Sequence, residues 1–78
     1  MNTYTRTTKI EKIRNADGQW LRIGDLVSHY WDALSASRYF EGEIVDIARG
    51  RIAIQDRDEV LWVHANFIKD AEIVERAR

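Results

Sequence analysis

Apolar residues in this chain occur in short runs, in places at intervals of two residues, and the runs are separated by polar or glycine-containing turns. That spacing is typical of β-strands, whose side chains alternate between the two faces of a sheet. Residues 8–23 contain two such runs, joined by Asn15-Ala16-Asp17-Gly18, whose residue types tolerate the positive φ of a tight turn. We therefore expect a β-hairpin over 8–23, preceded by a frayed arm.

The clearest hairpin signal lies in the middle of the chain, around a turn at residues 48–50. Ile44 and Ile47 precede this turn at an odd spacing, which predicts a bulge near Val45-Asp46 and hence a bent strand. The apolar residues after the turn alternate regularly again. This pair of strands should form the centre of the fold.

The other segments complete an antiparallel pattern. They are a bend at 24–25, a strand at 26–31, a loop or one helical turn at 32–38, a short strand at 60–63, a 3₁₀ turn within 64–68 before a last short strand, and a helical turn in the tail from 70. The run at 60–63 is apolar on both faces, so it should be a central or barrel-closing strand.

Short strands at such regular intervals predict an all-β fold, a small antiparallel barrel of five to six strands. An N-terminal hairpin or arm would precede it, and a short 3₁₀ turn would come before the last strand. Residues 1–14 would be a flexible basic arm or a first strand, 15–72 the barrel and 73–78 a C-terminal tail. Closure of the barrel would remove exposed strand edges.

Five segments keep a distinctive order: 24–27 (Gly-Asp-Leu-Val), 42–47 (Gly-Glu-Ile-Val-Asp-Ile), 52–54 (Ile-Ala-Ile), 62–63 (Trp-Val) and 67–68 (Phe-Ile). Over about residues 23–70 this order resembles SH3-like barrels, Tudor-like members included. In such folds the glycine-aspartate pair opens the first strand, the second segment is the bent strand, and a 3₁₀ turn precedes the last strand. The resemblance therefore implies an SH3-like fold.

Two members of this fold give different expectations for function. A Tudor-like chain implies an aromatic cage for a methylated ammonium group, with Tyr30 or Trp31, Tyr39 or Phe40, and Asp56 as candidates. The type II dihydrofolate reductases are also similar in length and in their Gly-Asp and Gly-Glu segments. Their catalytic strand reads Val-Gln-Ile-Tyr, whereas residues 60–63 here are Val-Leu-Trp-Val. Because Leu61 and Val63, at the positions of that glutamine and tyrosine, carry no hydrogen-bonding groups, we expect no reductase activity.

Composition narrows the function classes further. With 78 residues, no cysteine and no proline, the chain has room for one small domain without disulfides or thiolate zinc sites. The first ten residues lack the apolar core of a secretory signal, and no run is long enough to span a membrane, so we expect a cytoplasmic protein without membrane contact. The two histidines, His29 and His64, lack metal-ligand spacing. We expect His29 on the rim and His64 bonded to backbone, with no metal, no cofactor and no catalysis.

Three tryptophans are many for a chain of this length, because a thin barrel cannot easily enclose them all. We expect Trp62 in the core, with Trp20 or Trp31 exposed. Tryptophan and tyrosine are enriched at binding hot spots. We therefore expect a protein or peptide partner, and the predicted contact residues are Tyr30, Trp31, Tyr39, Phe40 and Asp56. Self-association to a homo-oligomer would use the same surface.

A second hypothesis follows from the uneven distribution of charge. Residues 1–14 carry a net charge of +3 and the rest of the chain −4, although the total is only −1. A basic arm and a basic hairpin tip would attract a phosphate backbone weakly and in a salt-dependent manner. The residues predicted for this nucleic-acid alternative are Lys9, Lys12, Arg14, Arg49 and Arg51.

Overall fold

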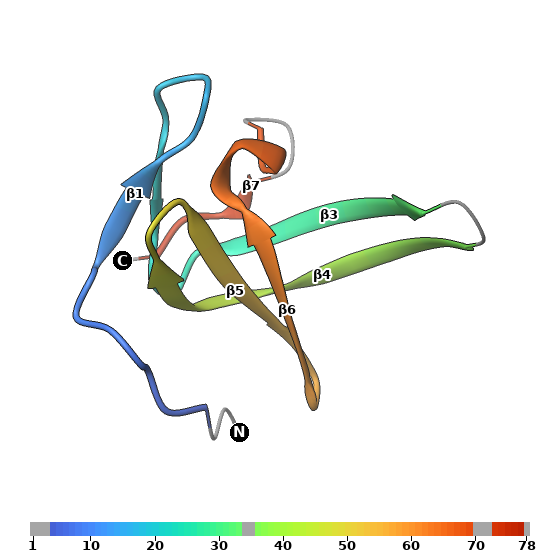
Figure 1. Ribbon diagram of the computed structural model, residues 1–78, viewed down its shortest axis with the longest axis horizontal. Coiled ribbons are helices and arrows are strands. Elements are labelled where there is room, and N and C mark those ends of the chain that lie inside the picture. The colour runs from blue at the N-terminus through green and yellow to red at the C-terminus, as the bar shows by residue number, and fades with distance from the viewer. Residues whose placement is uncertain (1–3, 34–35, 70–72, 78) are drawn as a thin grey trace.

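The computed structural model describes residues 4–33, 36–69 and 73–77, with side chains described for all of these except 31–33 and 36–38. Seven strands and one 3₁₀ helix account for most of this part of the chain (Figure 1). In chain order they are β1 (Lys12–Arg14), β2 (Trp20–Arg22), β3 (Leu26–Ala33), β4 (Ala36–Ala48), β5 (Arg51–Asp56), β6 (Glu59–His64), η1 (Ala65–Phe67) and β7 (Ile73–Glu75). The all-β prediction is confirmed.

The strands form two antiparallel sheets. β1 and β2 pair with each other, and the other five strands form one sheet in the order β6-β5-β4-β3-β7. The predicted barrel closure is wrong, because within the described residues β6 pairs with β5 alone and β7 with β3 alone. β6 is therefore an edge strand, not the central or barrel-closing strand that its apolar sequence favoured.

The N-terminal hairpin is shorter than predicted but has the expected turn. Asn15 organises it, since its Oδ1 accepts hydrogen bonds from the N–H groups of Asp17 at 3.0 Å and Gln19 at 2.9 Å. Gly18 adopts a φ of 81°, which glycine reaches without steric cost. The Nδ2 of Asn15 donates to the carbonyl oxygen of Ile68 at 2.7 Å and so joins this hairpin to the end of η1.

Residues 32–38 differ from the prediction of a loop or helical turn. Strand pairing continues through Asp32 opposite Ser37 and Ala33 opposite Ala36, so β3 and β4 form a long hairpin that projects to one side (Figure 1). The small residues there tolerate a helix, but the ladder already established between the two strands extends through them. Residues 34 and 35 lie outside the described residues.

The predicted bulge in β4 is confirmed. The register of β4 on β5 shifts between Ile44 and Asp46, and Ile44 and Ile47 are both fully buried despite their odd spacing. Gly42 lies just before the bulge, where a Cβ atom would be 2.0 Å from the carbonyl oxygen of Gln55. Only a glycine lets the two backbones approach this closely.

One hydrophobic core joins residues of both sheets. Its buried members are Leu21, Val27, Phe40, Ile44, Ile47, Ile52, Ile54, Val63, Ala65 and Ile68. β2, η1 and the strands β3 to β6 all contribute residues to this core, so the small N-terminal sheet is part of the same core.

Both ends of the described chain are tied to buried carboxylates. The segment expected to fray is held by hydrogen bonds from Tyr4, Thr7 and Thr8 to Asp46, a fully buried residue at the β4 bulge. At the other end, Asp25 Oδ1 accepts from the N–H of Ala77 at 2.7 Å. The tail forms β7 at 73–75, where the sequence favoured a helical turn.

Candidate binding surface

The aromatic patch predicted from the sequence is only partly assembled. Tyr30 and Tyr39 are direct cross-strand neighbours on the outer face of β3 and β4, and each is 60% exposed. The Tyr39 hydroxyl donates to Glu41 Oε2 at 2.8 Å, and this bond to a carboxylate raises the pKa of Tyr39. Phe40 alternates to the opposite face and is buried in the core, so it does not belong to this surface. The Trp31 side chain lies outside the described residues.

Asp56, the acidic member of the predicted cage, is at the end of β5 opposite Glu59. The hollow that it lines is formed by Asp56, Arg57, Asp58 and Glu59, and among the described residues no aromatic side chain lines it. This hollow gives Asp56 a polar, charged surrounding, unlike the aromatic faces that a methylammonium cage needs.

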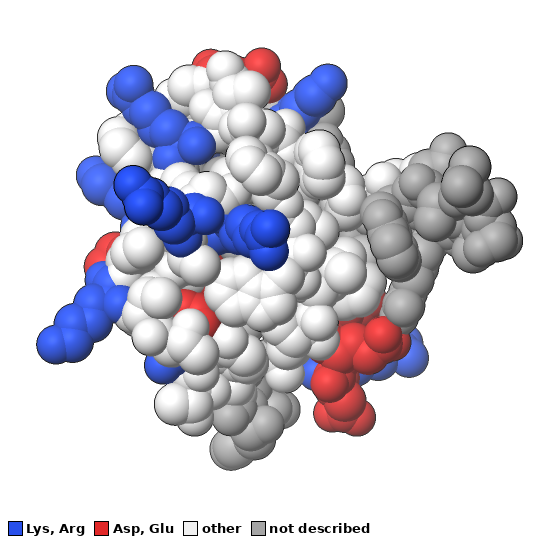
Figure 2. All heavy atoms as spheres, in the orientation of Figure 1, with Lys and Arg blue, Asp and Glu red and all other residues white. Residues whose placement is uncertain are grey.

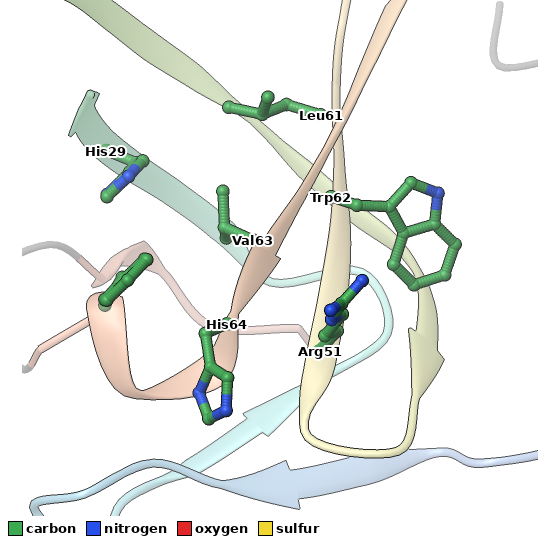
Figure 3. A pocket seen from close by; sticks show the side chains of 7 residues that line it. His29, Arg51, Leu61, Trp62, Val63 and His64 are labelled. Carbon is green, nitrogen blue, oxygen red and sulfur yellow. The ribbon is translucent and has the colours of Figure 1, made fainter. Parts of the chain in front are cut away.

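A different hollow combines aromatic, apolar and basic side chains. It has a volume of about 350 Å³ and is lined by His29, Arg51, Leu61, Trp62, Val63, His64 and Phe67 (Figure 3). Four of these residues belong to β6. We call this hollow the β6 groove.

The β6 groove contains side chains from both faces of β6. Leu61 and Val63 lie opposite Ile54 and Ile52, on the face directed toward the core, whereas Trp62 and His64 lie on the other face. Figure 3 shows Val63 and Trp62 on opposite sides of the strand. A hollow lined by both faces must pass around the edge of the strand, so the groove follows the unpaired edge of β6.

The prediction that Trp62 belongs to the core is wrong. This residue is 38% exposed because it occupies the outer face of an edge strand, opposite the small residue Ala53. Phe67 in η1 is 56% exposed and completes the apolar part of the groove. Sequence reasoning placed an aromatic residue in this 3₁₀ turn but did not include it in the site, because exposure depends on which strands lie at the sheet edge.

The two histidines line the groove in different ways. His29 is buried, not on the rim, because it shares the core-facing side of β3 with Val27. Its ring lies parallel to the ring of Phe67, with centroids 5.9 Å apart. His64 accepts a hydrogen bond from the backbone N–H of Asn66 through Nδ1, as predicted. In the described part of the chain, no three histidine, cysteine or acidic residues are grouped to hold a metal ion.

Basic side chains lie together on a neighbouring part of the surface. Lys12 Nζ and Arg14 Cζ are 4.4 and 4.9 Å from the centroid of the Trp20 ring, which is 37% exposed. Figure 2 shows Lys and Arg side chains gathered over β1 and the start of β5, and acidic side chains over the β5–β6 turn. All five residues of the nucleic-acid hypothesis, Lys9, Lys12, Arg14, Arg49 and Arg51, are exposed. On the face that Figure 2 shows, most of the basic side chains therefore lie apart from the largest acidic group.

Comparison of the chain with protein-family models, with curated proteins and with solved structures found no match. Among the described residues, no helix has the length and apolar character needed to cross a membrane.

Proposed function

We propose that this chain is a non-catalytic, SH3-like binding module that recognises a protein segment through the β6 groove. The proposal is supported mainly by one observation, the exposure of Trp62 and Phe67 beside a hollow that follows an unpaired strand edge. Exposed aromatic residues at a concave site are the usual anchors of protein recognition. The Gly-Asp opening at 24–25, the bulged β4 and the 3₁₀ helix before β7 support the SH3-like part.

The polar residues of the groove suggest how a peptide would be oriented. Arg51 and His64 lie opposite each other across β5 and β6, at the end of the groove nearest η1. The other end approaches the acidic turn of Asp58 and Glu59. A peptide with an apolar centre and an acidic residue at one end would match this arrangement.

Selection of random peptides displayed on phage against the immobilised full chain would test the proposal. The affinity of the selected peptides would then be measured by fluorescence anisotropy. We expect Trp62→Ala and Phe67→Ala each to weaken binding by about tenfold or more, because each removes an exposed aromatic anchor. Circular dichroism would check that both variants remain folded.

Tyr30→Ala is the matched control, because Tyr30 is an equally large exposed aromatic residue on β3 and does not line the groove. It should bind the selected peptides like the wild type. If Tyr30→Ala or Tyr39→Ala abolishes binding while Trp62→Ala does not, the tyrosine pair is the contact surface and the β6 groove is the wrong site.

The cation–π contacts of Trp20 favour a second candidate function, the binding of single-stranded nucleic acid. Lys12 and Arg14 present their charges around an exposed ring, a combination used by proteins that follow a phosphate backbone. Anisotropy with a labelled single-stranded oligonucleotide should then show affinity that falls steeply with salt, by about 0.7 logarithmic units per neutralised phosphate for each tenfold change. Lys12→Glu should abolish binding, and Arg57→Glu, on the acidic turn, should not. Equal binding by both variants would exclude this surface.

A further inference from the structure

In the described part of the chain, no strand pairs with the edge of β6 that faces away from β5, and this unpaired edge lacks the features that usually prevent edge strands from pairing. Its four central residues, 60–63, carry no charge, and its register on β5 contains no bulge. The other edge of the sheet, β7, is only three residues long, includes Glu75 and has a register shift on β3. Natural sheets protect their edges with charges, bulges and short strands. By these criteria β7 is protected and β6 is not.

The hydrogen-bonding groups at this edge can be assigned from the strand register. The N–H of Ala65 donates to the carbonyl oxygen of Gly50 at 2.9 Å, and in an antiparallel ladder such bonded pairs recur at every second residue. Leu61 and Val63 therefore bond toward β5. The backbone groups of Val60, Trp62 and His64 point away from β5, toward the groove.

The charges at the two ends of the strand specify what would pair with it. β6 begins at Glu59, next to Asp58, and ends at His64, which lies opposite Arg51. An added antiparallel strand would therefore need an acidic start, an apolar centre and a basic end. β6 itself meets these requirements, because it begins at Glu59, has an apolar centre and ends at His64, beside which Arg51 of β5 supplies the positive charge.

We propose that the β6 groove binds β6 of a second copy of this chain, in an antiparallel arrangement about a two-fold axis at Trp62. This inference rests on the proposed function and names the protein partner of that site. In this register Trp62 lies opposite Trp62 of the second copy, and Val60 lies opposite His64. The backbone groups of Val60, Trp62 and His64, which point away from β5, are then all paired. Three such pairs give about six backbone hydrogen bonds across the interface.

The arrangement also accounts for the exposed rings and the separated charges. The two Trp62 rings lie on the same face of the joined sheet and cover each other, because residues directly opposite share a face. The acidic turn of each copy comes next to the end of β6 in the other copy, where His64 lies opposite Arg51 of β5. Both requirements of the groove, an apolar centre and complementary ends, are met by one symmetric contact.

Sedimentation equilibrium of the full chain over about two decades of concentration tests this inference, since a dimer must dissociate on dilution. The expected result is a reversible monomer–dimer equilibrium. Val60→Lys places a charge at the unpaired edge and should weaken the dimer about tenfold or more. Val74→Lys is the matched control, because Val74 is an exposed valine on the opposite edge strand, and it should leave the dimer unchanged.

Hydrogen exchange of the wild-type chain provides a test that needs no substitution. The amides of Val60, Trp62 and His64 should gain protection as the concentration rises, whereas those on the outer edge of β7 should not. A chain that stays monomeric throughout, or a dimer weakened by Val74→Lys and not by Val60→Lys, overturns the inference. The phage-display experiment tests the proposed function separately. A chain that stays monomeric but binds selected peptides at the groove would overturn the dimer alone, and failure of peptide selection would overturn the proposed function.

Discussion

The carboxylate of Asp46 accepts hydrogen bonds from the Tyr4 hydroxyl at 2.8 Å and from the N–H and hydroxyl of Thr7 at 2.9 and 2.7 Å. Its other oxygen accepts from the N–H of Ile47 at 2.9 Å. Burial alone would raise the pKa of Asp46, but the hydrogen bonds from Thr7, Tyr4 and Ile47 outweigh it and lower the pKa from 3.8 to about 2. The ionised carboxylate is therefore the form that the fold stabilises.

This lowered pKa predicts acid sensitivity with a defined sign. As the pH falls, the unfolded chain takes up the proton before the folded chain does, so the free energy of unfolding decreases. The contribution of Asp46 is complete above pH 3.8 and is lost as the pH falls toward about 2. Urea denaturation at a series of pH values would measure it.

Asp46→Asn should lower the free energy of unfolding at pH 7 by roughly 2 kcal/mol and flatten the pH dependence in this window, because hydrogen bonds to a charged acceptor are lost. Asp58→Asn is the control, since Asp58 is exposed on the β5–β6 turn. An Asp46→Asn variant with the same acid sensitivity as the wild type would contradict this account.

At the scale of elements, the close approach of β4 and β5 depends on the absence of a side chain at position 42. A methyl group there would lie 2.0 Å from the carbonyl oxygen of Gln55, which is backbone and cannot rotate away. Gly42→Ala should therefore cost about 3 kcal/mol of stability, as overpacking in a closely packed region does. Thermal or urea denaturation would measure the cost.

Gly18→Ala is the control for this steric effect, because it also replaces a glycine by alanine but creates no clash. Gly18 has a φ of 81° and nothing within 4 Å of an added Cβ, so only the backbone conformation resists the change. We expect a cost of about 1 kcal/mol. If Gly42→Ala costs no more than Gly18→Ala, the strands can separate and their close approach does not constrain the fold.

The elements differ in how far the sequence predicts them, and the difference has a physical cause. The bulge in β4 was predictable because the odd spacing of Ile44 and Ile47 is a local signal. The exposure of Trp62 was not, because a strand that is apolar on both faces has the same sequence at an edge as in the centre. The β6 groove could not be predicted for the same reason, since it exists only where the sheet ends.

At the scale of the whole molecule, two buried carboxylates bind segments near the two ends of the described chain. Asp46 binds the segment around Tyr4 and Thr7, and Asp25 binds Ala77 and lies 3.8 Å from the guanidinium of Arg76. Asp46 belongs to β4, and Asp25 lies in the bend just before β3. Among the described hydrogen bonds, the two carboxylates share no partner residue. In a domain this small, the terminal segments then add burial that the sheet alone lacks.

Hydrogen exchange should show this independence directly. Asp46→Asn should speed exchange of the Thr7 amide and leave the Ala77 amide unchanged, whereas Asp25→Asn should speed exchange at Ala77 and leave Thr7 unchanged. The combined variant should lose stability by about the sum of the two single losses, because sites without shared partners behave additively. If either substitution instead releases both ends together, the two terminal segments unfold as one cooperative unit, and their attachment must pass through the core that they share.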